Sequence, residues 1–117
     1  MLAPIKLLLL VLTVAANASV ADPPETVVVT YHPLAGKEAA VAQVLREQRE
    51  TLARLDLMAP GTCHVTYVDG AAFVDVFTWK SHATPDNAPE EILALWTRLN
   101  ALVQKENGIE IREVTLP

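Results

Sequence analysis

The stretch FVDVFTWKSH, residues 73–82, alternates between two kinds of side chain, which is the pattern of an extended strand. Its two sides carry different residues: Val74, Val76 and Thr78 on one, and Phe73, Asp75, Phe77 and Trp79 on the other. The second side places a carboxylate between aromatic rings. Either Asp75 faces water there, or this side of the strand lines a pocket.

The sequence around this strand predicts the order strand, helix, strand, strand, helix, strand. Asp69-Gly70 separates residues 63–68 from residues 71–80, and this dipeptide is a strong signal for a β-hairpin. Residues 25–33 and 109–117 are also rich in β-branched side chains, which predicts the first and last strands.

Two segments have the spacing of amphipathic helices. In residues 34–58 the predicted buried stripe is Val41, Val44, Leu45, Gln48, Leu52 and Leu55. In the second helix it is Ile92, Leu95, Trp96, Leu99, Leu102 and Val103. We expect Asn87 to cap the start of this helix with Glu90 as its partner, and Asn107-Gly108 to end it.

The βαββαβ order predicts an α+β, ferredoxin-like fold, in which four antiparallel strands carry both helices on one face. The other face would be bare in a single chain, and large apolar areas are seldom left in water. We therefore expect two chains to pack sheet against sheet as a homodimer, a dimeric α/β barrel.

Residues 1–21 have the composition of a secretory signal peptide. Lys6 precedes an apolar run, and small residues follow before Asp22. Cleavage after Ala18 or after Ala21 would both satisfy the small-residue rule. The run is short for a membrane span, so we expect an exported protein, periplasmic or extracellular, with one domain over residues 22–117 and no membrane contact after cleavage.

The charge balance of the predicted domain excludes several partners. The whole chain has a net charge of −5, and removal of Lys6 with the signal peptide gives −6. An acidic domain without a cluster of basic residues is not expected to bind nucleic acid or anionic membranes. Cys63 is the single cysteine, so an internal disulfide is impossible and stability must come from packing or association.

Three pieces of the chain resemble the antibiotic biosynthesis monooxygenase-like group of dimeric α/β barrels. They are the helix entry formed by Pro33, Gly36, Lys37 and Glu38, the strand FVDVFTWKS at 73–81, and the helix PEEILALWTRLNALV at 89–103. The resemblance implies a small homodimer with a cavity between sheet and helices or between paired sheets. The group includes cofactor-independent oxygenases of quinols and polyphenols, haem-degrading relatives, and members without an established activity.

One part of the chain departs from that group. Related sequences often carry a histidine at the entrance of the second helix, where this chain has Asp86-Asn87-Ala88. The nearest histidine is His82, in the preceding loop, so a role that depends on a helix-entry histidine does not transfer.

Alternation within the strands predicts the candidate site. If the helices take the aliphatic faces, the remaining faces gather on one surface the residues Thr30, His32, His64, Thr66, Asp75, Phe77 and Trp79. We expect His64 and Asp75 to be the catalytic pair, because histidine with a carboxylate can accept a phenolic proton near neutral pH. The others would bind a flat aromatic substrate.

Each of these residues also has a purely structural interpretation. His32 and His64 can be strand-end or sheet residues, and Asp75 can pair with Arg112 across a dimer seam. Trp79 and Trp96 can be core aromatics. These interpretations favour a non-catalytic homodimer that binds a small molecule or is only structural, and this alternative stays open beside a cofactor-independent monooxygenase.

No motif for another chemistry is present in the sequence. There is no glycine-rich phosphate loop, no G-x-S-x-G turn and no Cys-x-x-Cys pair. The three histidines lack the close spacing of a zinc or haem site. The sequence therefore predicts no cofactor and no metal.

Overall fold

The computed structural model describes residues 22–60, 63–68 and 70–114. The predicted signal peptide and its two candidate cleavage positions lie outside the described residues. In the part of the chain that is described, no helix combines the length and the apolar character needed to cross a membrane.

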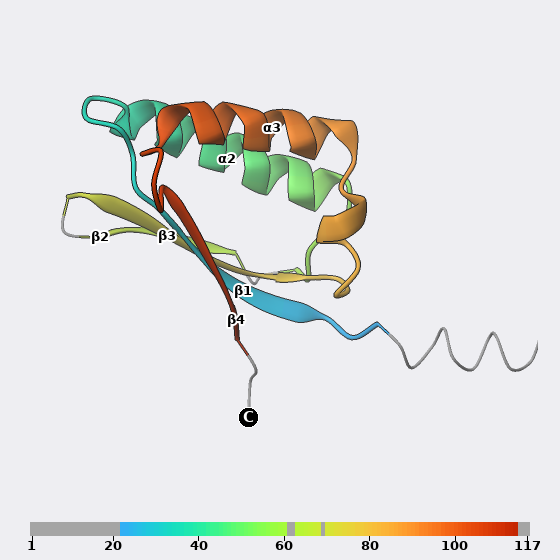
Figure 1. Ribbon diagram of the computed structural model, residues 1–117. Coiled ribbons are helices and arrows are strands. Elements are labelled where there is room, and N and C mark those ends of the chain that lie inside the picture. The colour runs from blue at the N-terminus through green and yellow to red at the C-terminus, as the bar shows by residue number, and fades with distance from the viewer. Residues whose placement is uncertain (1–21, 61–62, 69, 115–117) are drawn as a thin grey trace, which may run out of the picture.

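The element order is the predicted one (Figure 1). The strands are β1 (Glu25–Tyr31), β2 (His64–Val68), β3 (Ala72–Trp79) and β4 (Ile109–Val114). The helices are α2 (Glu38–Arg54) and α3 (Glu90–Leu102), and a short 3₁₀ turn covers Pro85–Asn87. Each element before β4 is shorter than its sequence pattern, and the predicted continuation of β4 over residues 115–117 lies outside the described residues.

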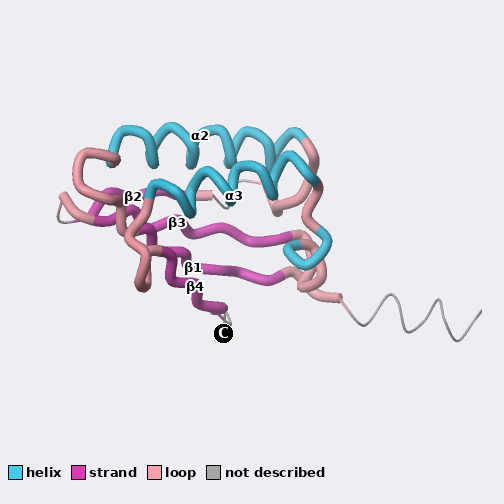
Figure 2. The backbone as a smooth tube through the Cα atoms, turned by 45° about the horizontal axis from the view of Figure 1, so that its top comes forward, coloured by secondary structure: helices cyan, strands magenta, loops and turns pink. Residues whose placement is uncertain are grey.

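The four strands form one antiparallel sheet in the order β2-β3-β1-β4. Both helices cover the same face of this sheet, as Figures 1 and 2 show from two directions. The predicted α+β, ferredoxin-like architecture is therefore confirmed.

The helices meet the sheet through the predicted stripes. Most of these side chains are fully buried, namely Val41, Val44, Leu45, Gln48 and Leu52 in α2, and Ile92, Leu95 and Leu99 in α3 with Val103 just after it. Gln48 is the polar exception, and only 2% of it is exposed.

The prediction for the two faces of β3 is wrong. Val29 in β1 faces the helices, and it lies directly opposite Asp75 in β3. Opposite residues of paired strands share a face, so the side with Phe73, Asp75, Phe77 and Trp79 packs under the helices. Val74, Val76 and Thr78 lie on the other side and are only partly buried.

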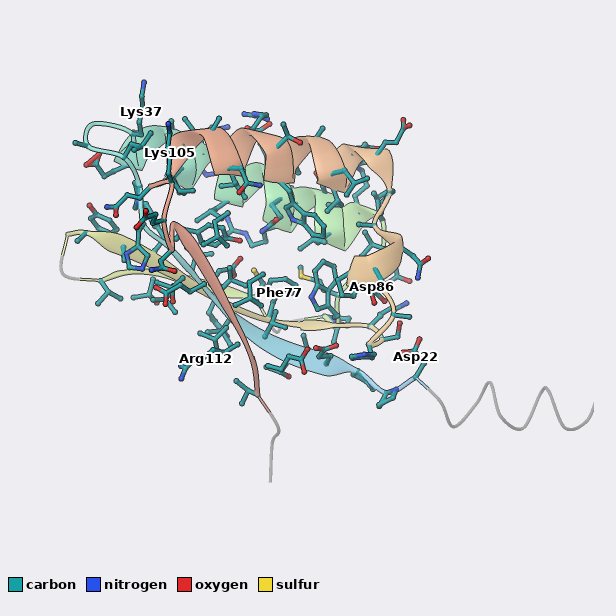
Figure 3. The ribbon with its side chains drawn as sticks, in the orientation of Figure 1. Asp22, Lys37, Phe77, Asp86, Lys105 and Arg112 are labelled. Atoms are coloured by element: carbon teal, nitrogen blue, oxygen red, sulfur yellow. The ribbon has the colours of Figure 1, made fainter. Side chains whose placement is uncertain are left out.

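Figure 3 shows both sides of the sheet. Phe77 points into the space between sheet and helices, and Arg112 points away from the helices. The side turned away from the helices is here called the open face. Its central residues are Val28, Thr30, Val74, Val76 and Thr78, and none of them is fully buried.

The start of α3 also differs from the prediction. Asn87 lies in the 3₁₀ turn, and its side-chain amide donates a 2.9 Å hydrogen bond to the carbonyl of Ala83. Pro89 is the N-cap residue instead. Asn87 therefore closes the turn and does not cap the helix.

The end of α3 lies before the predicted Asn107-Gly108 stop. The helix ends at Leu102, and Val103 forms a bridge with Pro33. Asn107 has a positive φ of 54°, and a side chain at Gly108 would meet the carbonyl oxygen of Gln104 at 2.0 Å. The dipeptide therefore forms the turn into β4.

Candidate active site

A cavity of about 410 Å³ lies between the sheet and the helices. β1 contributes Val27, Val29 and Tyr31 to its wall, β3 contributes Phe77 and Trp79, and the two helices contribute Gln48, Trp96, Leu99 and Asn100. Ile109, Ile111 and Glu113 of β4 form another side, and Glu25 and Pro85 complete it. The volume lies in the range of small-molecule sites.

The cavity opens beside β4. Ile111 is opposite Val29 and so faces the helix side of the sheet, yet 66% of it is exposed. Val29 is 6% exposed. The two helices therefore cover β1 but not β4, and this uncovered strand gives the cavity its entrance.

Three aromatic side chains form one wall. The rings of Phe77 and Trp79 lie 4.9 Å apart between centroids at 69°, and those of Trp79 and Trp96 lie 6.3 Å apart at 88°. These edge-to-face contacts fix the ring planes. The wall can therefore hold a flat apolar ligand in one orientation.

A polar cluster formed by Gln48, Tyr31 and Trp96 lies deep in the cavity. The indole N–H of Trp96 donates a 2.8 Å hydrogen bond to Oε1 of Gln48. The Gln48 side chain also hydrogen-bonds the hydroxyl of Tyr31. Burial, reinforced by the charge of Asp75, raises the pKa of Tyr31 far above its usual value, so its hydroxyl stays protonated and can donate.

Asp75 lies beside this polar cluster but does not line the cavity. It is 1% exposed, and the Cys63 thiol donates to its Oδ1 at 3.7 Å. Burial raises the pKa of Asp75 to about 6, while Cys63 and the charge of Arg49 act in the opposite direction. Burial and the Asp75 charge also raise the pKa of Cys63 to about 11, so its thiol is not a nucleophile near neutral pH.

A cluster of three titratable side chains lies at the rim of the cavity. Glu25, His82 and Glu113 place their ligating atoms within 4.8 Å of one another. Nδ1 of His82 is 2.6 Å from Oε2 of Glu25, and this contact raises the pKa of His82. A hydrogen bond with Glu25 and its negative charge raise the pKa of Glu113.

The structure does not bring the predicted catalytic pair together. His64 is opposite Val76, and Val65 is opposite Asp75. Since side chains of successive strand residues point to opposite faces, His64 is exposed on the open face while Asp75 is buried under the helices. The expected His64–Asp75 pair is therefore wrong, and Arg112, also on the open face, does not lie on the side of Asp75.

The predicted substrate-binding residues are divided in the same way. Phe77 and Trp79 line the cavity. Thr30 and Thr66 lie on the open face. His32 follows β1, and its Nε2 is 2.8 Å from Oε1 of Glu110.

Sequence reasoning missed most of the site. The sequence pattern places Tyr31 in a strand and Gln48 and Trp96 in helix stripes, although a glutamine within an apolar stripe signals a buried polar contact. Glu25, His82 and Glu113 are far apart in the chain, so no local spacing could reveal their cluster.

No family model matches the sequence, and no curated protein matches it significantly. Solved structures do match the fold. SnoaB, a cofactor-independent oxygenase from Streptomyces nogalater, superposes with a TM-score of 0.64 at 20% sequence identity, over 81% of this chain and 94% of SnoaB. An antibiotic biosynthesis monooxygenase gives 0.66 at 18% identity, over 80% and 98%.

Rv0793 from Mycobacterium tuberculosis is similar to the chain in the same way. Its TM-score is 0.63 at 14% identity, over 80% of this chain and 95% of Rv0793. At these identities the likeness shows a shared fold. The fold expected from the resemblance in sequence is thus confirmed.

Proposed function

We propose, from the fold shared with SnoaB and the antibiotic biosynthesis monooxygenase, that the protein is a cofactor-independent monooxygenase of a quinol or small aromatic compound. The observation that carries the proposal is the cavity of about 410 Å³, with its wall of Phe77, Trp79 and Trp96 and a buried polar end formed by Gln48 and Tyr31. A hydroxylated aromatic ring matches both features, because its faces are apolar and its hydroxyl needs a partner.

The polar end suggests how the ligand would be activated. An aromatic hydroxyl group reacts with molecular oxygen after it has lost its proton, because the resulting anion is electron-rich. Tyr31 stays protonated and Gln48 carries amide N–H groups, so both can donate hydrogen bonds to that anion. Donors that favour the charged form lower the pKa of the bound hydroxyl, and its proton can leave through the entrance beside β4.

The histidine base expected from sequence has no place in this proposal. Within the described residues, no histidine lines the cavity. Asp75 acts instead on Tyr31, since its charge helps to keep the Tyr31 hydroxyl protonated. Asp75 is thus a positioning residue for the donor.

The lack of a histidine among the described lining residues also favours a second function. The same cavity can bind an aromatic ligand without transforming it, so the chain can be a binding protein. The two functions differ in one measurable property, which is the uptake of oxygen in the presence of a bound ligand.

Binding is measured first, through the intrinsic fluorescence of the two tryptophans. Both line the cavity, so a ligand there must change the emission. We expect saturable quenching by at least one member of a panel of hydroquinones and naphthols. Gln48→Met should weaken binding at least tenfold, and Gln43→Met, at an exposed glutamine of the same helix, should leave it unchanged.

Oxygen consumption then separates the two functions. Uptake above the spontaneous rate, lost in Gln48→Met and kept in Gln43→Met, supports the monooxygenase. Saturable binding without uptake supports the binding protein. A panel that produces no quenching at all contradicts both.

Homodimer formation is part of the proposal. The open face carries Val28, Val74 and Val76 at its centre, and Val68 and Val114 toward its edges are 38% and 37% exposed. An apolar sheet face of this kind is a common site of association. A second copy of the chain can cover it by packing sheet against sheet.

Export through the N-terminal signal peptide also remains a proposal. It is supported by the order of basic, apolar and small residues in positions 1–21.

The absence of a basic cluster agrees with a protein that acts on a small molecule and not on nucleic acid.

A further inference from the structure

Three side chains meet at the rim of the cavity from distant parts of the chain. Glu25 is the first residue of β1, His82 lies in the loop after β3, and Glu113 lies in β4. One oxygen of each carboxylate and one ring nitrogen of the histidine lie within 4.8 Å of one another. The cluster therefore has the composition of a metal site, with one nitrogen and two oxygen ligands.

The backbone under this cluster is firmly held. Glu25 is opposite Trp79, and Glu113 is opposite Val27, so sheet pairing fixes the backbone that carries both carboxylates. The His82 N–H donates a 2.9 Å hydrogen bond to the carbonyl of Pro23. These bonds hold the three backbone positions together before any ligand arrives, which reduces the entropy that binding must overcome.

The loop that carries His82 has further support. The N–H of Ala83 donates to Oδ1 of Asp22 at 3.0 Å, and the hydroxyls of Ser81 and Thr84 are 2.7 Å apart. In Figure 3, Asp22 and Asp86 mark this end of the molecule, where the start of β1 and the loop after β3 lie together. The imidazole is thus attached to a structured turn.

The electrostatics of the cluster favour a cation. Glu25 and Glu113 bring two like charges together, and the Glu25 side chain is only 13% exposed. Within residues 22–60, 63–68 and 70–114, neither carboxylate forms an ion pair with lysine or arginine. A bound divalent cation can balance both carboxylates at once.

We propose that a divalent transition-metal ion binds at the rim of the cavity through Glu25, His82 and Glu113. Imidazole nitrogen with carboxylate oxygen suits Zn²⁺ and its first-row neighbours, whereas Mg²⁺ and Ca²⁺ prefer oxygen ligands alone. Ligands of a tetrahedral zinc ion with bonds of ~2 Å lie roughly 3.3 Å apart. The exposed side chains of His82 and Glu113 can rotate to close the remaining distance.

A second histidine–carboxylate pair in the protein provides a matched control. Nε2 of His32 is 2.8 Å from Oε1 of Glu110, and both side chains are partly exposed, at 33% and 57%. This pair offers one carboxylate, and the rim cluster offers two. A third ligand is therefore the feature that distinguishes the two sites.

The test is calorimetric titration of the full chain, without an affinity tag, with Zn²⁺ at pH 7.5. We expect one saturable site per chain. His82→Ala and Glu113→Gln should each weaken it at least tenfold, whereas His32→Ala and Glu110→Gln should leave the dissociation constant within twofold. Thermal unfolding of each variant confirms that the substitution has not removed the fold.

Two further measurements use other ions. Co²⁺ should quench the emission of Trp79, which is opposite Glu25 in the sheet, and His82→Ala should abolish this quenching. Millimolar Mg²⁺ should not displace Zn²⁺.

Three outcomes overturn the proposal: no saturable binding, equal affinity in the wild type and both rim variants, or displacement of Zn²⁺ by Mg²⁺. The titrations contain no aromatic compound. Failure here therefore leaves the proposed monooxygenase function untouched, and failure of aromatic binding leaves the metal site untouched.

Discussion

The indole N–H of Trp96 in α3 donates a 2.8 Å hydrogen bond to the side-chain oxygen of Gln48 in α2. This bond joins the two helices directly over the sheet. Trp96 also contacts Trp79 of β3 edge to face, at 6.3 Å between centroids. One buried glutamine therefore links α2, α3 and the aromatic wall of the cavity.

Replacing Gln48 should destabilise the protein. In Gln48→Met the side chain keeps its size but loses its acceptor, so the Trp96 N–H is left buried without this partner. The cost of such an unpaired group is ~1–3 kcal/mol, and we expect the free energy of unfolding to fall by that amount in urea denaturation. Gln43→Met, at an exposed position of α2, should change it by less than ~0.5 kcal/mol. Equal losses in both variants would contradict the assigned role.

Asp75 should make stability depend on pH. Burial raises its pKa from 3.8 to about 6 in the folded state. Between these values the folded protein holds a proton that the unfolded chain has released. Stability from this group is therefore greatest below about pH 4, falls up to about pH 6 and stays lower above it, by roughly 3 kcal/mol at ~1.4 kcal/mol per pKa unit.

Asp75→Asn removes this titration. The difference in free energy of unfolding between the wild type and Asp75→Asn should shift across pH 4–6 in favour of the variant. The measurement is urea denaturation at several pH values. Asp86→Asn, at an exposed carboxylate, is the control and should follow the wild type. A pH-independent difference for Asp75→Asn would show that Asp75 does not titrate in this range.

The open face should mediate dimer formation. Val76 lies at its centre, opposite Val28 on one side and His64 on the other. We expect a dimer mass in light scattering at micromolar concentration for the wild type and a monomer mass for Val76→Glu, because the substitution buries an unpaired charge. Leu93→Glu, on the outer side of α3 with Leu93 48% exposed, should remain dimeric. A monomeric wild type refutes the prediction.

Export should remove the N-terminal segment. When the chain is expressed in cells with a secretory system, mass spectrometry of the exported protein should give Ser19 or Asp22 as its first residue. Leu9→Asp interrupts the apolar run and should keep the chain uncleaved in the cell. Export of intact chain beginning at Met1 would show that residues 1–21 are not a cleaved signal.

The sequence by itself determined the architecture. The three- and four-residue spacing of Val41, Val44 and Leu45 requires a helix with one buried side, and Asp69-Gly70 requires a tight hairpin. These are local properties, since they depend on the period of the backbone and on the turn. Together they fix the order βαββαβ, which leaves one face of the sheet uncovered.

The tertiary structure decided which side of β3 is inside. Alternation separates Val74 and Val76 from Asp75 and Phe77, but a strand with apolar residues on both sides can present either to the helices. The register with β1 makes the choice, because Val29 is opposite Asp75. A shift of one residue in the register between β1 and β3 would turn the other side of β3 toward the helices.

Tertiary contacts alone also assemble the candidate sites. Glu25, His82 and Glu113 meet because β1 lies between β3 and β4 in the sheet, an arrangement that no local pattern contains. Likewise, the sequence shows Gln48 only as a polar residue within an apolar stripe. The tertiary structure adds its hydrogen-bond partner, Trp96 of α3. Periodicity fixes which residues share a side of an element, whereas strand pairing and helix packing fix which sides face each other, and the chemistry depends on the latter.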